Sequence, residues 1–249
     1  LIPTDLTKLG NFAYSVAELI AERTGATIDI LSIVPGPQGA IYTVDGGLRS
    51  DDGDDISEWT RRLDQLKSDL ANWTKDKKNI NSYFAKIGRV EEDIIYYAEH
   101  NNIDLIVMGT KGAHGMGEWM RGSHTEHITN HVSIPVLSVK CDRSSMDLTN
   151  MVFVSDFLEA NEIDLHVVKE LQHAFESKLQ LLRIKTPSEK QNDGIILTLM
   201  SQFVKNNGLN NYEFNIYESK SVERGIQDFT KEKAFDLIIL GTHQRKGLG

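Results

Sequence analysis

A glycine-rich segment near the middle of the chain has the composition of a ligand-binding loop. Five glycines fall within the fifteen residues from Gly109 to Ser123, directly after the apolar run 103–108. A backbone with so few Cβ atoms can approach a phosphate group closely, and its N–H groups can then bind the anion. The segment is not a Walker A loop, since Glu118 and not lysine follows Gly117. It is not the dinucleotide fingerprint either, because Met120 stands where the third glycine is required.

The segment matches a different pattern, Gly-x2-Gly-x9-Gly-Ser, through Gly109, Gly112, Gly122 and Ser123. Ser123 and Glu126 also form an S-x-x-E capping box, so Ser123 can have the simpler role of starting a helix. The two roles are compatible, because a capped helix N-terminus also favours anions.

The elements around this segment alternate between apolar strands and amphipathic helices. In the first half, Phe12, Val16, Leu19 and Ile20 share one helix face, and the order reads β-α-β-α-β-α-β-α-β. Strands that are continuous apolar runs separated by helices predict an α/β fold with a parallel sheet covered on both faces. The expected strands after the first are 27–34, 80–87, 103–108 and 134–139, and a short helix is expected at 123–130.

The chain also repeats itself. Residues 103–110 return as 235–242, an offset of 132, and residues 1–6 return as 152–157, an offset of 151. We therefore expect two domains of one type, 1–142 and 143–249, each an open five-stranded parallel sheet sandwiched by helices. The acidic, Gly-rich stretch from Gly36 to Asp55 is the candidate for what the second copy lacks, and its charge run 51–55 is interpreted as solvated surface in a loop. We expect residues to be missing at both ends, so that the second copy is truncated.

Length and composition limit the class of protein. The chain has 249 residues, 40% of them hydrophobic and 25% charged, which predicts one or two globular domains. A net charge of -9 disfavours nucleic acids and anionic membranes as partners. No apolar run is long enough for a membrane span. The single Cys141 predicts no intrachain disulfide, and a reducing cytoplasm is the expected location.

With its flanking residues, the glycine pattern resembles the ATP-binding subgroup of the universal stress protein family. The opening Ile2-Pro3-Thr4-Asp5 is similar to that family's first strand and turn, and His131 and Pro135 stand where its members commonly have these residues. The resemblance covers essentially the whole chain, as a tandem two-domain member. It implies a fold like that of the adenine nucleotide alpha-hydrolases.

The resemblance also implies a role for each site residue. The adenine and ribose would be held at the tip of the first strand and by the end of the second strand. The ribose would lie beside the end of the fourth strand, and the phosphates at the N-terminus of the following helix. The residues that would hold the adenine and ribose are Pro3, Thr4, Asp5 and Ile33, and those beside the ribose are Met108, Gly109 and Gly112. The phosphates would be held by Gly122, Ser123 and the N–H of His124, and Gly88 would line the same crevice.

Simpler interpretations stay open for several of these residues. Asp5 can cap the following helix or form a turn, Met108 can belong to the core, and the glycines can form ordinary turns. His124, His127 and His131 share a helix face if that helix is regular. No metal site is expected there, because three ligands over two turns rarely converge on one ion.

The second copy departs from the pattern. Asp156 repeats Asp5 and Gly241 repeats Gly109, but Gln244 replaces the counterpart of Gly112 and Lys220 that of Gly88. We therefore expect only the first domain to bind nucleotide. The resemblance implies that the second domain pairs with it as an intrachain pseudo-dimer, with a homo-oligomer and an unidentified protein as further partners.

These observations favour a universal stress protein that binds ATP, or AMP or ADP, with Mg²⁺ as an optional companion, and that regulates a stress response. No general base or arranged nucleophile is identifiable, so fast catalysis is not expected and no catalytic residue is assigned. A slow ATPase and a nucleotide-free protein-interaction module are the alternatives.

Overall fold

A computed structural model describes residues 1–37, 40–43, 46–49, 56–110, 123–142, 146–158 and 164–241. The chain divides into two compact units, Leu1–Ser144 and Ser145–Gly249. Gly112 and Gly122, predicted to bind nucleotide, lie outside the described residues, as do Gln244 and the acidic run 51–55.

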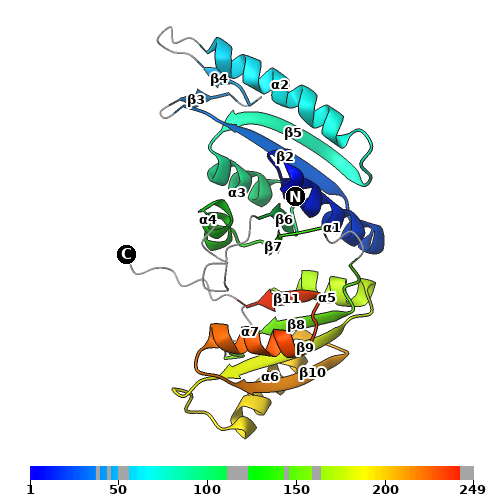
Figure 1. The fold of residues 1–249 in the computed structure, drawn as a ribbon, viewed down its shortest axis with the longest axis vertical. Coiled ribbons are helices and arrows are strands. Elements are labelled where there is room, and N and C mark those ends of the chain that lie inside the picture. Colours follow the sequence, from blue (N-terminus) through cyan, green and yellow to red (C-terminus); the bar gives the residue numbers. More distant parts are fainter. Residues whose placement is uncertain are drawn as a thin grey trace. The chain divides into compact units, whose positions relative to one another are not determined.

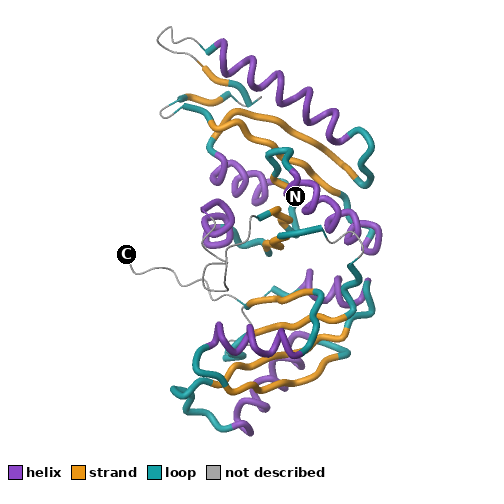
Figure 2. The backbone as a smooth tube through the Cα atoms, in the orientation of Figure 1, coloured by secondary structure: helices purple, strands orange, loops and turns teal. Residues whose placement is uncertain are grey.

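The first unit is a parallel sheet with helices on both faces (Figures 1 and 2). Its sheet has the strand order β5-β2-β1, and a second pair, β6-β7, continues it. Val107 N donates to Leu1 O at 2.8 Å, which joins β6 to β1. The five strands therefore follow the order β5-β2-β1-β6-β7. The strands are β1 (Ile2–Pro3), β2 (Ile28–Pro35), β5 (Ile80–Gly88), β6 (Ile106–Gly109) and β7 (Val136–Val139).

Alternation along the strands divides the core between the two faces. Leu1, Leu31 and Met108 pack with α3 and α4, whereas Ile2 and Ile30 point to the opposite face, toward α1 and α2. Figure 1 shows α2 running along β5. The helices are α1 (Lys8–Thr24), α2 (Ser57–Thr74), α3 (Val90–His100) and α4 (Ser123–His131).

The second unit repeats this plan with the order β10-β9-β8-β11, all parallel. Leu1 lies opposite Ile106 of β6, and Val152 pairs with Ile238. Val152 is the counterpart of Leu1 at the offset of 151, and Ile238 is the counterpart of Ile106 at the offset of 132, so the sequence repeat also holds in the pairing of the strands. The elements are β8 (Asn150–Val154), α5 (His166–Ala174), β9 (Lys178–Lys185), α6 (Asp193–Asn207), β10 (Tyr212–Glu218), α7 (Val222–Glu232) and β11 (Leu237–Leu240).

Three phenylalanines form the centre of the second unit's core. Phe153 and Phe203 stack with ring centroids 5.5 Å apart, and Phe157 meets Phe203 edge-on at 5.2 Å. All three are at most 1% exposed. They attach α6 to the turn after β8, so the position of that turn depends on aromatic packing.

The stretch 36–55 is not wholly the loop that we predicted. It contains a hairpin of two short antiparallel strands, β3 (Ile41–Tyr42) and β4 (Leu48–Arg49). Gly46, with φ 86°, brings its carbonyl to Ile87 N of β5 at 2.7 Å. A Cβ atom on Gly46 would lie 2.6 Å from Lys86 Cβ, so glycine is required for this approach.

Among the residues that the structure describes, no helix combines the length and apolar character that crossing a bilayer demands.

Candidate functional site

The strand order of the first unit reverses between β1 and β6. The chain moves outward from β1 through β2 to β5, and then returns to place β6 on the other side of β1. In open α/β sheets, ligands bind at the carboxyl ends of the strands beside such a reversal. Pro3 ends β1 and Gly109 ends β6, so two groups of predicted site residues, far apart in sequence, lie on neighbouring strands.

The turn after β1 is held by backbone and side-chain hydrogen bonds. Thr4 N donates to Leu31 O at 2.9 Å, and Leu6 N donates to Thr4 Oγ1 at 3.0 Å. The N–H and hydroxyl of Thr7 both donate to Asp5 Oδ1, at 3.1 and 2.7 Å. These bonds hold Leu6 at φ 62°, a left-handed conformation that costs a non-glycine residue about 1–2 kcal/mol.

Asp5 therefore forms a turn, as its simpler interpretation predicts, but with one oxygen only. Its side chain is exposed, and Oδ2 accepts no hydrogen bond from any other described residue. One carboxylate oxygen fixes the turn, and the other remains available to a ligand.

The second unit has the same turn. Phe157 N donates to Ser155 Oγ and Leu158 N donates to Asp156 Oδ1, both at 3.1 Å, and Phe157 has φ 58°. Because both units share the turn, it belongs to the architecture and does not by itself indicate a ligand.

Sequence reasoning missed Ser32, which supports the turn from the neighbouring strand β2. It is 2% exposed, and its hydroxyl donates to Thr4 O at 2.7 Å. A serine inside an apolar strand is the only signal of this role in the sequence.

Two glycines of the predicted crevice have packing reasons to be glycine. A Cβ atom at Gly109 would lie 2.2 Å from Leu9 O, because the end of β6 touches the first turn of α1. A Cβ atom at Gly88 would lie 1.9 Å from Asp93 Oδ2. That carboxylate accepts from Arg89 N at 2.8 Å and, through Oδ1, pairs with Lys86 Nζ at 2.7 Å.

Met108 and Ile33 lie on the same face of the sheet, near the strand reversal. Met108 is 7% exposed and belongs to the cluster around α3 and α4, so its side chain is part of the core. Ile33 is half-buried against the same cluster. Its partial exposure at the end of β2 is compatible with contact to a base.

Comparison with known proteins identifies the family. The model of the universal stress protein family matches residues 1–140. The chain belongs to this family. A universal stress protein from Methanocaldococcus jannaschii is 28% identical over 122 residues, which make up 49% of this chain and 73% of that protein.

Solved structures of universal stress proteins share the fold of the whole chain. One from Archaeoglobus fulgidus has a TM-score of 0.68 at 18% identity, covering 99% of this chain and 86% of that one. A Pseudomonas aeruginosa protein given the same family name has a TM-score of 0.55 at 15% identity, covering 100% and 82%. At these identities the likeness shows the fold alone.

In this universal stress protein, the N-terminal end of α4 is tied to α3. His124 Nδ1 lies 2.6 Å from Glu91 Oε1, in the first turn of α3. Burial raises the pKa of Glu91, but a backbone N–H and His124 outweigh it, so the pKa lies below its usual value. The His124 side chain thus faces Glu91, which leaves its backbone N–H as the group predicted to meet a phosphate. Ser123 is the first residue of α4.

Ion pairs lie at the corresponding edge of the second unit. The offset of 151 places Lys185 at the position of Val34, and Lys185 Nζ pairs with Asp193 at 2.7 Å and Glu218 at 3.4 Å. Arg183, at the position of Ser32, pairs with Glu189, and both side chains are 12% exposed. These charged groups cross the carboxyl ends of β9 and β10.

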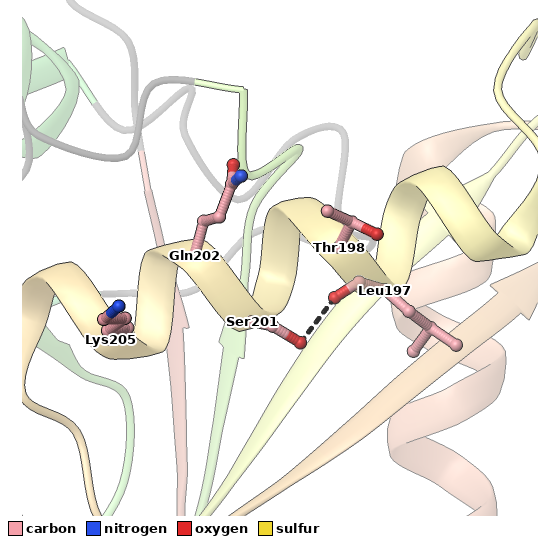
Figure 3. A pocket seen from close by; sticks show the side chains of 5 residues that line it. All are labelled: Leu197, Thr198, Ser201, Gln202 and Lys205. Carbon is pink, nitrogen blue, oxygen red and sulfur yellow. Dashed lines mark hydrogen bonds between the residues drawn. The ribbon is translucent and has the colours of Figure 1, made fainter.

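Neither of two surface hollows among the described residues lies at the strand reversal. One has a volume of about 350 Å³ and follows the outer face of α6, where Ser201 donates to Leu197 O at 2.7 Å (Figure 3). The other lies between α2 and the start of β5. Neither brings together the convergent charged groups of a catalytic site.

Proposed function

We propose that the first unit binds an adenine nucleotide, ATP in preference to AMP or ADP, and that the protein regulates a stress response without fast turnover. The observation that carries this proposal is the strand reversal, which brings the Asp5 turn beside the strand that leads into the glycine-rich segment. Family membership supports it.

In this proposal the two strand ends divide the ligand between them. Asp5 Oδ2 accepts hydrogen bonds from the ribose hydroxyls, while Ile33 contacts the base. Met108 and Gly109 border the ribose. The N–H groups at the start of α4 meet the phosphates, where the helix dipole favours negative charge.

A bound Mg²⁺ would arrive with the phosphates. No group of three or more His, Cys, Asp or Glu side chains in the described part of the chain is arranged to hold a metal ion. This is compatible with Mg²⁺, which usually keeps several waters and binds through phosphate oxygens and one or two carboxylates.

We further propose one nucleotide per chain. The second unit keeps the turn at Asp156, but Lys185, paired with Asp193 and Glu218, stands where the first unit has Val34. Arg183 and Glu189 form a largely buried ion pair at the position of Ser32, so a ligand held by the end of β9 would have to displace charged groups. A cytoplasmic location and an unidentified protein partner complete the proposal.

The first test is mass spectrometry of small molecules released by denaturing freshly purified protein, followed by calorimetric titration with ATP, AMP and adenosine. We expect an adenine nucleotide to be released and ATP to bind at one site per chain. No released nucleotide together with no ATP binding would favour the nucleotide-free interaction module. Two sites per chain would contradict the one-site proposal.

The second test compares the same substitution in both units. Asp5→Asn keeps an oxygen for Thr7 but removes the charge, and a hydrogen bond to a charged group contributes about 1.5–3 kcal/mol. We expect ATP affinity to fall roughly ten- to hundredfold. Asp156→Asn makes the same change in the second unit and should leave ATP binding unaltered. Equal effects of the two substitutions would place the nucleotide elsewhere.

Slow hydrolysis is measured separately. Steady phosphate release that is abolished by Gly122→Val, in protein that remains folded, would establish the slow ATPase alternative.

A further inference from the structure

Two histidines lie side by side on the last turns of α4. His127 and His131 are four residues apart, which places them on one face of the helix. Their ring centroids are 4.2 Å apart and their planes differ by 19°. Both residues are exposed. The two imidazoles are therefore neighbours at the surface, away from the helix end predicted to bind phosphate. Stacked rings hold their in-plane lone pairs in nearly parallel planes, so the exposed His127 ring must turn edge-on to His131 before both can bind one ion.

The hydrogen bond of His131 determines which ring nitrogen is free. His131 Nδ1 lies 2.7 Å from His127 O. A carbonyl oxygen only accepts, so Nδ1 carries the proton, and the lone pair is on Nε2, which points away from that carbonyl. Metal-ligating histidines usually have this arrangement, with one ring nitrogen donating to a carbonyl or carboxylate and the other bound to the ion. The ring nitrogens of His127 have no hydrogen-bond partner among the described residues.

The surroundings favour a cation. Helix α4 contains Glu126 and neither lysine nor arginine, and His131 is its last residue, where the helix dipole is negative. His127 is among the groups that lower the pKa of Glu91, so this carboxylate lies within electrostatic reach of the pair. The chain as a whole carries a net charge of -9.

We propose that His127 and His131 form a two-histidine chelate for a divalent transition-metal ion such as Zn²⁺ or Cu²⁺. Imidazole suits these ions, whereas Mg²⁺ and Ca²⁺ prefer oxygen ligands. Two protein ligands leave the remaining coordination positions to water, so the ion is exchangeable. His124 is not a ligand in this proposal, because it lies a further turn away, toward the N-terminus of α4, and its Nδ1 faces Glu91.

The chain contains a matched control for this geometry. His100 stands four residues after Tyr96 on α3, stacks on it with centroids 4.0 Å apart, and has Nδ1 2.8 Å from the Tyr96 carbonyl. The local arrangement is that of His131, but the neighbouring ring is a phenol and not a second imidazole. His100→Gln therefore removes an equivalent histidine without removing a chelate.

The experiment is calorimetric titration of the full chain with ZnCl₂, CuCl₂ and MgCl₂ without nucleotide. It is done in a Cys141→Ser background, because Cys141 is a free and exposed thiol. We expect binding of Cu²⁺ tighter than Zn²⁺, and none of Mg²⁺ in the same range. His127→Gln and His131→Gln should each weaken Zn²⁺ and Cu²⁺ binding at least about tenfold, by analogy with the loss of outer-shell partners. His100→Gln should leave it unchanged.

Thermal melting provides a second readout, since an ion that binds only the folded chain raises the melting temperature. Zn²⁺ should raise it in the parent protein and in His100→Gln, but not in His131→Gln. The proposal is overturned if His127→Gln or His131→Gln binds Zn²⁺ like the parent, if His100→Gln loses binding equally, or if Mg²⁺ binds as well as Zn²⁺. The result does not depend on the nucleotide proposal.

Discussion

Gly109→Ala provides a sharp test of why a predicted ligand-binding residue is glycine. The added Cβ would lie 2.2 Å from Leu9 O, 2.5 Å from Leu9 C and 2.8 Å from Leu9 Cβ. The two shortest contacts are to backbone atoms, so no side-chain rotation relieves them. Helix α1 must move by about 1 Å to restore ordinary contact distances.

The expected cost is at the upper end of the range for overpacking. Such substitutions usually destabilise by about 1–3 kcal/mol, and a clash with backbone favours a value near 3 kcal/mol. At roughly 2–4 °C per kcal/mol for a protein of this size, the melting transition of the first unit should fall by about 6–12 °C. Differential scanning calorimetry measures this shift and separates it from the transition of the second unit.

Gly194→Ala is the matched control. Gly194 lies in the first turn of α6, and its added Cβ would approach only Asn192 Oδ1, at 3.3 Å. We expect a change within about 1 kcal/mol, the size of the helix-propensity difference. If Gly109→Ala melts like the parent chain but loses ATP affinity, the packing explanation is wrong and the glycine serves the ligand alone.

Three further substitutions test the structure. Ser32→Ala removes the donor to the partly buried Thr4 O and should cost about 1–3 kcal/mol in chemical unfolding; an unchanged midpoint would show that the bond is dispensable. Phe157→Ala should cost about 3–5 kcal/mol and affect only the second unit's transition. The pKa of Glu91 is lower in the folded chain than its unfolded value of about 4.5. The ionised carboxylate therefore stabilises the folded chain above pH 4.5, and this stabilisation is lost as the pH falls through the folded pKa. Glu91→Gln should therefore reduce the loss of stability below pH 4.5, and an identical acid profile would contradict this.

The strand pattern was predictable because parallel strands buried on both faces are continuous apolar runs. The predicted strand 80–87 is observed as Ile80–Gly88, and 27–34 as Ile28–Pro35. The hairpin was not predictable in this way. Its strands have two residues each, and they depend on contacts of Gly46 with Lys86 and Ile87, forty residues further along the chain.

The site residues illustrate a different limit. Glycine spacing locates a loop, but it does not distinguish a glycine that admits a ligand from one that admits another helix. Gly109 lies against Leu9 and Gly88 lies against Asp93, and these contacts depend on how the folded chain packs. The pairing of His124 with Glu91 likewise depends on how α3 packs on α4. The roles of Gly112 and Gly122 and the pairing of the two domains remain predictions.

The β3–β4 hairpin affects how the first unit avoids self-association. By accepting from Ile87, Gly46 occupies part of the outer border of β5, a strand that exposes Tyr83 and Phe84. Unsatisfied border amides beside exposed aromatic rings invite strand addition by another molecule. A shortened chain without the hairpin would leave the Ile87 amide unpaired at that border, open to strand addition by another molecule.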